Sequence, residues 1–203
     1  IITDQFTKNI GKILEEKCKN FTNYISHITI PAFINHGEPV SKEIEKEMLS
    51  STTIFGLTTK SMAHTESRLK ATENGIKYLS LPYYSEDVLK DKSLLVDFRE
   101  FIKKSENLAL IFSKGKKVHI TSKNGTDLKF SIENRLGNPA PGCCYKSGVI
   151  ASPPDSETNI AIVENSTNGK LVVDGSIPIE GFGLLKKPIC IDFKNGYAIS
   201  FTG

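Results

Sequence analysis

Four histidines, His27, His36, His64 and His119, are the residues of this sequence best suited to acid–base or metal chemistry. None of them lies in an H-E-x-x-H or H-x-H arrangement, so no pair has the spacing of a zinc site. His27 and His119 alternate within strand-like segments and His36 lies in a loop, which favours structural or surface roles. His64 follows a strand-like segment near the expected start of a helix, where open α/β sheets place ligands. We expect His64 to help dock this loop, with a functional role as the alternative.

Other catalytic motifs are absent from the sequence. There is no G-x-S-x-G elbow, no P-loop and no G-x-G-x-x-G segment; the nearest, Gly181-Phe182-Gly183, lacks the third glycine and a following helix. Local motifs therefore support neither a serine hydrolase nor a nucleotide-binding protein, and no catalytic residue is assigned. The cysteines have no zinc-knuckle or disulfide spacing, so we expect four free thiols in a reducing compartment. They are Cys18, Cys143, Cys144 and Cys190.

The elements that position these residues alternate between strand and helix over residues 1–112. The expected helices are 6–21, 41–49, 61–74 and 85–104, and the expected strands are 24–30, 52–57 and 76–81. Ser41 is the expected N-cap of the second helix and Ser61 that of the third. Alternation of this length predicts an α/β fold with an open, mainly parallel sheet and helices on both faces.

The character of the chain changes after Glu106, where helical periodicity disappears and Asn-Gly turn signals begin. The expected short strands are 108–112, 117–121, 127–131, 159–163, 170–173 and 189–193. We therefore expect two domains, an α/β domain at 1–112 and a β-rich domain at 113–203. The second is expected to be the incomplete beginning of a catalytic domain.

Composition excludes two classes of partner. The net charge is +3, with 26 basic residues interspersed among 23 acidic ones, which does not indicate a nucleic-acid-binding surface. No apolar run approaches the roughly 18 residues of a membrane span, and no signal peptide is visible at Ile1. These features predict a cytoplasmic protein that binds neither nucleic acid nor membrane. The first residues resemble the tail of a strand, so we expect that residues preceding Ile1 are missing.

Four motifs occur in a definite order: TKSMAHTESR at 59–68, KNGTDL at 123–128, PDSE at 154–157 and GKLVVDG at 169–175. They resemble the Ser-x-x-His-Thr helix, the Gly-Thr-Asp-Leu turn, the Pro-x-Gly-Glu segment and the final hairpin of the thermophilic leucyl aminopeptidase (aminopeptidase T) family. The resemblance covers nearly the whole chain. Ser156 departs from the family's glycine, and Ile162 replaces its usual proline.

This resemblance implies a metalloaminopeptidase, a hydrolase that removes N-terminal residues from peptides with a pair of divalent ions, zinc, cobalt or manganese. Glu157 matches a metal-binding glutamate of the family, and a carboxylate can bridge two cations. The other ligands, a His, an Asp, a Tyr and a second Glu, belong to a region that would follow Gly203. We therefore expect a metal-binding parent enzyme, inactivity of this chain alone, and a homo-oligomer such as a dimer.

Two alternatives remain open. A related branch of the same superfamily resembles iron-dependent dihydroxypyridine dioxygenases, which cleave the ring of a small-molecule substrate with a mononuclear His/His/Asp site. That branch need not keep the glutamate, so Glu157 favours the peptidase. The third possibility is a non-catalytic binding module of the same fold. A metal titration separates the three hypotheses: two divalent ions, one iron, or none.

Overall fold

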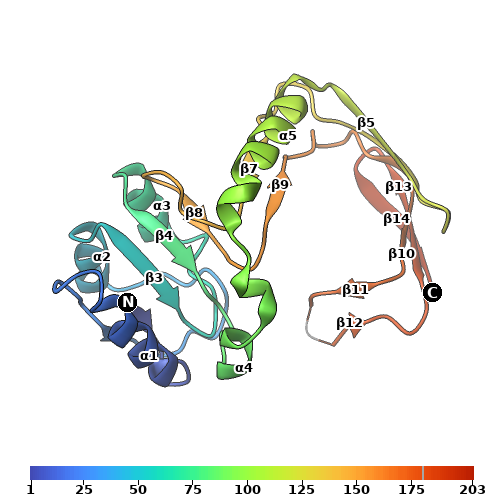
Figure 1. Cartoon of the computed structure of the whole chain (residues 1–203). Coiled ribbons are helices and arrows are strands. Elements are labelled where there is room, and N and C mark those ends of the chain that lie inside the picture. The colour runs from blue at the N-terminus through green and yellow to red at the C-terminus, as the bar shows by residue number, and fades with distance from the viewer. Residues whose placement is uncertain (180) are drawn as a thin grey trace. The chain divides into compact units, whose positions relative to one another are not determined.

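The computed structural model describes residues 1–179 and 181–203, and these form two compact units (Figure 1). Unit 1 consists of Ile1–Ser105 and Ala140–Glu157, and unit 2 of Glu106–Pro139 and Thr158–Gly203. Each unit is thus assembled from two segments of chain. The predicted division into domains 1–112 and 113–203 stays a prediction, because compactness of packing does not measure which segments fold independently.

Unit 1 is built on a five-stranded sheet in the order β2-β1-β3-β4-β8, in which every neighbouring pair is parallel (Figure 1). The strands are β1 (Ile2–Thr3), β2 (Ile28–Thr29), β3 (Thr53–Leu57), β4 (Lys77–Ser80) and β8 (Ile150–Ala151). All five carboxyl ends therefore lie along one edge, and the loops that follow the strands meet there. The predicted α/β class with a parallel sheet is confirmed.

Helices cover both faces of this sheet because β3 alternates its side chains between two apolar clusters. Ile54 packs with Met48 of α2 and Ala71 of α3, whereas Leu57 packs with Ile10 of α1 on the opposite face. The helices are α1 (Lys8–Cys18), α2 (Lys42–Leu49), α3 (Glu66–Glu73), α4 (Glu86–Leu89) and α5 (Ile102–Lys114), with short 3-10 turns at Lys92–Leu95 and Phe98–Phe101. Ser41 caps α2 as predicted, accepting the Ile44 N–H at 3.4 Å.

The helix expected over 61–74 starts later than predicted. Thr65, with extended backbone, is the N-cap of α3, and its Oγ1 accepts the Arg68 N–H at 3.3 Å. Ser61 instead directs its Oγ to the Ala63 N–H and the Ser80 hydroxyl, so the predicted Ser61 cap is wrong. Met62 and Ala63, which precede Thr65, are buried in the core without being part of the helix.

The strand expected at 108–112 is also wrong, since these residues belong to α5. An unbroken apolar run of five residues does not by itself distinguish a strand from one and a half helical turns. Here the preceding residues from Ile102 already have helical structure, and the helix continues through the run to Lys114, before Gly115.

Unit 2 contains an antiparallel five-stranded sheet in the order β14-β13-β10-β6-β5. The strands are β5 (Lys117–Thr121), β6 (Asp127–Ser131), β10 (Asn168–Val173), β13 (Ile189–Lys194) and β14 (Tyr197–Thr202). Asn195 and Gly196 join β13 to β14 with positive φ at both positions, the geometry that favours Asn-Gly in a two-residue hairpin. The predicted β-rich character of this part of the chain is confirmed.

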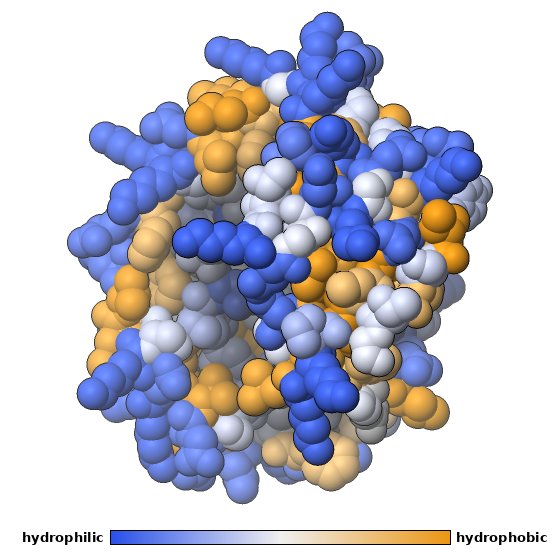
Figure 2. All heavy atoms as spheres, turned by 90° about the vertical axis from the view of Figure 1, so that its right-hand side faces the viewer, coloured by the Kyte–Doolittle hydropathy of each residue, from blue (hydrophilic) through white to orange (hydrophobic). Residues whose placement is uncertain are grey.

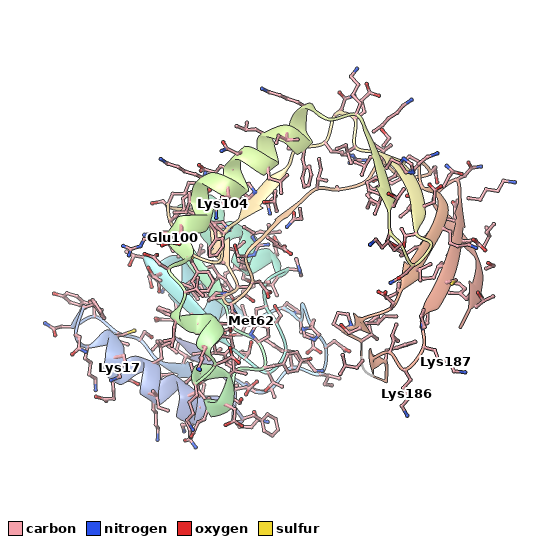
Figure 3. The ribbon with its side chains drawn as sticks, turned by 45° about the vertical axis from the view of Figure 1, so that its right-hand side comes forward. Lys17, Met62, Glu100, Lys104, Lys186 and Lys187 are labelled. Carbon is pink, nitrogen blue, oxygen red and sulfur yellow. The ribbon has the colours of Figure 1, made fainter. Side chains whose placement is uncertain are left out.

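Short strand pairs complete the described structure. They are β11 (Ser176–Ile177) with β12 (Gly183–Leu184), and β7 (Asn138–Ala140) with β9 (Glu157–Asn159). Lys186 and Lys187 extend away from the segment after β12, as expected for solvated charges (Figure 3). Among the described residues, no helix has the length and apolar character that crossing a membrane requires.

Candidate functional site

The carboxyl edge of the parallel sheet in unit 1 gathers polar side chains from several strand ends. In open α/β sheets, ligands bind outside this edge, because the loops there are free to present polar groups. Asp4 follows β1, the segment 58–61 follows β3, and Tyr83 and Tyr84 follow β4. Asp4, Ser61, Tyr83 and Tyr84 each make hydrogen bonds to another loop at this edge.

Asp4 is a fully buried carboxylate that ties the ends of β1 and β3 together. Its Oδ1 accepts the backbone N–H groups of Phe6 and Thr7, and its Oδ2 accepts the N–H of Thr59 at 2.6 Å. Burial alone would raise the pKa of Asp4, but the hydrogen bonds from Thr59, Phe6 and Thr7 lower it below its ordinary value. Because its oxygens point to backbone donors, Asp4 organises the edge rather than offering itself to a ligand.

A cluster of four residues, His36, Lys60, Ser61 and Tyr83, lies beyond this edge; we call it the carboxyl-edge cluster. The Ser61 N–H donates to Nδ1 of His36 at 3.0 Å, and His36 Nε2 lies 2.9 Å from the Tyr83 hydroxyl. Lys60 Nζ donates to the same hydroxyl oxygen at 3.4 Å and lies 5.7 Å from the centre of the Tyr83 ring. An ammonium, an imidazole and a phenol therefore share one oxygen atom.

Tyr84 links the loop after β4 to the loop after β8. Its hydroxyl donates to the carbonyl of Pro153, and burial, followed by the nearby Asp155 carboxylate, raises the pKa of Tyr84 to about 12. Tyr83, the preceding residue, has a φ of 58°, a left-handed conformation that costs a non-glycine residue about 1–3 kcal/mol. The Tyr83 side chain is therefore exposed, whereas the Tyr84 hydroxyl is bound to the loop after β8.

The structure places the two sequence candidates in different settings. Glu157 is exposed at the start of β9, and its main-chain carbonyl accepts the Ser105 hydroxyl at 3.0 Å. His64 is exposed in the loop between β3 and α3, directly before the N-cap Thr65. Sequence reasoning assigned His36 to a structural loop and did not consider Tyr83. The sequence signal that could have found them is position: His36 follows the expected strand 24–30, and Tyr83 follows the expected strand 76–81.

An acid–imidazole–hydroxyl chain also exists at the other side of unit 1. His27 Nδ1 lies 2.8 Å from Glu15 Oε2, and His27 Nε2 lies 3.1 Å from the Thr3 hydroxyl. A Cβ at Gly11 would come within 2.7 Å of His27 Nε2, so glycine is required for this approach. Thr3 is fully buried and its hydroxyl also donates to the Ile28 carbonyl, so this chain joins α1 to the sheet and offers no accessible nucleophile.

A cavity of about 830 Å³ lies at the opposite, amino-terminal ends of β1, β2 and β3. Its walls are mainly apolar, with Ile1, Phe21, Tyr24 and Met48 among the lining residues. This cavity contains no grouping of acids, bases or nucleophiles that the hydrogen-bond network aligns for chemistry.

The four cysteines are free, as predicted. Burial, the largest influence, raises the pKa of Cys144 to about 11, and its Sγ contacts the carbonyls of Tyr78 and Val149. Burial likewise raises the pKa of Cys143. Neither thiol has the lowered pKa of a metal ligand or nucleophile.

The described residues do not build a metal centre. Among them, no three His, Cys, Asp or Glu side chains gather into a group that could hold a metal ion. The donors found close together are already engaged: His36 by a backbone N–H and a phenol, and His27 by Glu15 and Thr3. Residues 1–179 and 181–203 therefore do not bring together the ligand set that a metal centre needs.

Comparison with known proteins gives a consistent result. The family model described as 2,5-dihydroxypyridine 5,6-dioxygenase matches residues 35–203. The structure of 2,5-dihydroxypyridine dioxygenase from Pseudomonas putida KT2440 aligns with a TM-score of 0.80 and 14% sequence identity. That alignment covers 99% of this chain and 61% of the other, so this chain spans less than two thirds of its length. At this identity the likeness shows the fold. No curated protein matches.

The expected metalloaminopeptidase function is wrong. The family match is to a dioxygenase, so the terms hydrolase, aminopeptidase and protease do not apply. The short motifs at 59–68, 123–128, 154–157 and 169–175 do not distinguish a peptidase from a dioxygenase. Glu157, a single exposed carboxylate, is too weak a discriminator between the two.

Proposed function

Because this chain belongs to the 2,5-dihydroxypyridine 5,6-dioxygenase family, we propose that it forms part of a dioxygenase that opens the ring of a hydroxylated nitrogen heterocycle. The observation that carries the proposal is the family match over residues 35–203, which includes most of the parallel sheet and all of the antiparallel sheet. The similar fold of the Pseudomonas putida enzyme over 99% of this chain supports it.

The proposed cofactor is iron, which suits oxygen chemistry with imidazole and carboxylate ligands. Zinc, cobalt or manganese, expected from the peptidase resemblance, have no remaining support. Since the described residues form no group of three ligands, a mononuclear iron site needs donors in addition to any that they provide. Glu157 stays a proposed metal ligand on its sequence motif alone.

The role of unit 1 in this proposal is to carry the polar carboxyl edge. Asp4 fixes the loop that contains Thr59 and Lys60, and Tyr84 fixes the loop that presents Tyr83. Contacts within unit 1 therefore hold both loops in place, and their side chains do not need to bind a metal to be positioned.

Oxygen consumption tests the proposed function. The complete protein that contains this chain is purified, loaded with ferrous iron under anaerobic conditions and then mixed with oxygenated buffer and 2,5-dihydroxypyridine. We expect one O₂ consumed per ring opened, with both atoms of ¹⁸O₂ in the product. Leucine p-nitroanilide with zinc or cobalt is the control and should not be hydrolysed. Iron-loaded, folded protein that consumes no oxygen with hydroxypyridines would contradict the proposal.

A second measurement concerns Glu157. If its carboxylate binds metal, Glu157→Gln should lower the iron content per chain, measured by elemental analysis after gel filtration. Asp155→Asn is the matched control, since it removes an exposed carboxylate two residues away. Equal iron content in both variants and the parent would remove Glu157 from the set of ligands.

We also propose that the protein acts on a small molecule and forms a homo-oligomer in the cytoplasm. Support for association comes from β14, an edge strand whose alternate side chains Tyr197, Ile199 and Phe201 are all more than 60% exposed. Figure 2 shows hydrophobic side chains in separate patches among hydrophilic ones. Light scattering after gel filtration tests the oligomer, with Ile199→Lys expected to reduce association; a monomer at all concentrations would contradict it.

A further inference from the structure

The carboxyl-edge cluster has a hydrogen-bond pattern that leaves a donor unused. The Ser61 backbone N–H donates to His36 Nδ1, so that nitrogen carries no proton. The ring proton of neutral His36 must then be on Nε2, which donates to the Tyr83 oxygen at 2.9 Å. His36 is therefore a fixed donor to the phenol and leaves the phenol's own hydrogen for another acceptor.

Lys60 adds a positive charge to the same point. Its Nζ donates to the Tyr83 oxygen at 3.4 Å, and the rest of its hydrogens are not used by any described neighbour. Within residues 1–179 and 181–203, no carboxylate lies within ion-pair distance of Lys60. The Lys60 ammonium and the Tyr83 hydroxyl each keep an unused hydrogen-bond donor. No carboxylate among the described residues accepts a hydrogen bond from either of them.

Hydrogen bonds hold the backbone that carries Lys60 and Ser61. The Lys60 carbonyl accepts the Thr58 hydroxyl at 2.7 Å, and the Ser61 carbonyl accepts the Gly37 N–H at 2.9 Å. Tyr83 keeps its left-handed backbone although this costs free energy. Conformations of this kind concentrate at ligand sites, where surrounding contacts sustain them.

We propose that Lys60 and Tyr83 bind the carboxylate group of a small organic acid at the carboxyl edge of the sheet in unit 1. One carboxylate oxygen accepts from the Lys60 ammonium and the other from the Tyr83 hydroxyl, and His36 is a positioning residue that orients the phenol. Two donors match the two oxygens of a carboxylate, whereas a phosphate presents more acceptors than the cluster supplies. The proposal is independent of the dioxygenase function.

The test is a ligand titration of the purified protein by saturation-transfer NMR, and it requires no metal. Nicotinate represents an aromatic acid and maleate an open-chain acid, while nicotinamide and inorganic phosphate are controls. We expect millimolar binding of at least one carboxylate and at least tenfold weaker binding of nicotinamide and phosphate. The tighter binder of the two, nicotinate or maleate, shows whether the site prefers an aromatic or an open-chain acid.

Variants locate the site. Lys60→Met should weaken carboxylate binding at least tenfold and Tyr83→Phe about threefold or more, because each removes one donor. Lys46→Met and Tyr24→Phe are matched controls, since both side chains are exposed and lie outside the cluster. Circular dichroism and thermal melting check that each variant is folded.

The positioning role of His36 has its own readout. Carboxylate binding should shift the ¹⁵N resonance of His36 Nε2 in the parent, because the hydrogen bond to Tyr83 changes, and should not shift it in Tyr83→Phe. Three outcomes would overturn the proposal: equal binding of nicotinamide, equal binding of phosphate, or carboxylate binding that Lys60→Met and Tyr83→Phe leave unchanged. Absence of binding by both acids would overturn it as well.

Discussion

The carboxylate of Asp4 accepts the backbone N–H of Thr59 at 2.6 Å, although 55 residues separate them in the chain. The same carboxylate also receives the N–H groups of Phe6 and Thr7. One buried side chain therefore joins the carboxyl ends of β1 and β3, and the loop that carries Lys60 depends on it.

Asp4→Asn should destabilise the protein by about 1–3 kcal/mol, because it weakens charge-assisted hydrogen bonds to buried N–H groups. The folded-state pKa of Asp4 lies below its ordinary value of about 3.9, so its carboxylate stabilises the fold above that pH. This contribution is lost as pH falls through the folded-state pKa. Thermal melts between pH 7 and pH 2 should show a shallower acid loss in Asp4→Asn than in the parent. Asp87→Asn, an exposed control, should keep the parent's slope.

Gly56 and Tyr78 form a pair whose substitutions should be coupled. A Cβ at position 56 would lie 2.2 Å from the Tyr78 hydroxyl oxygen, so Gly56→Ala should destabilise by about 1–3 kcal/mol. Tyr78 is fully buried and its hydroxyl has no hydrogen-bond partner among the described residues, so Tyr78→Phe should be neutral or stabilising. In a double-mutant cycle by urea unfolding, Tyr78→Phe should recover part of the loss. Additive effects of the two changes would show that the predicted clash does not exist.

The N-cap of α3 can be identified by substitution. Thr65→Ala should lower the free energy of unfolding by about 1 kcal/mol, since it leaves the Arg68 N–H without its cap, whereas Thr65→Ser should retain most of it. Ser61→Ala is the comparison, because Ser61 was the expected cap. A larger loss from Ser61→Ala than from Thr65→Ala would place the start of the helix four residues earlier than the structure has it.

Cys144 should be the slowest of the four thiols to react in the folded protein. Its pKa of about 11 leaves only about one thiol in a thousand ionised at pH 8, against roughly a quarter for an ordinary cysteine. Alkylation with iodoacetamide at pH 8, followed by peptide mass mapping, should modify Cys18 and Cys190 well before Cys144. In denaturant, all four should react at similar rates. Rapid labelling of Cys144 in folded protein would contradict the burial that raises its pKa.

Sequence alone determined the class of the fold, because periodicity is a local property. The alternation of strand-like and helical segments predicted the parallel sheet of unit 1, and the Asn-Gly turn signals predicted the β-rich character of the chain after Glu106. Prediction from the sequence failed where tertiary packing overrides local propensity: residues 108–112 are helical, and residues 61–64 lie outside α3. The main resemblance, to the aminopeptidases, was wrong, and the family match supports the dioxygenase that the sequence offered as an alternative.

Only the tertiary structure decided which side chains meet. Ile150 and Ala151 join β4 as the fifth parallel strand, although their partners in that strand, Tyr78 and Leu79, lie 72 residues earlier in the chain. The cluster of His36, Lys60 and Tyr83 comes from three separate loops, and no spacing in the sequence connects them. Parallel strands bring their carboxyl ends to one edge whatever the length of the connections between them, so proximity there is a property of the sheet and not of the sequence interval.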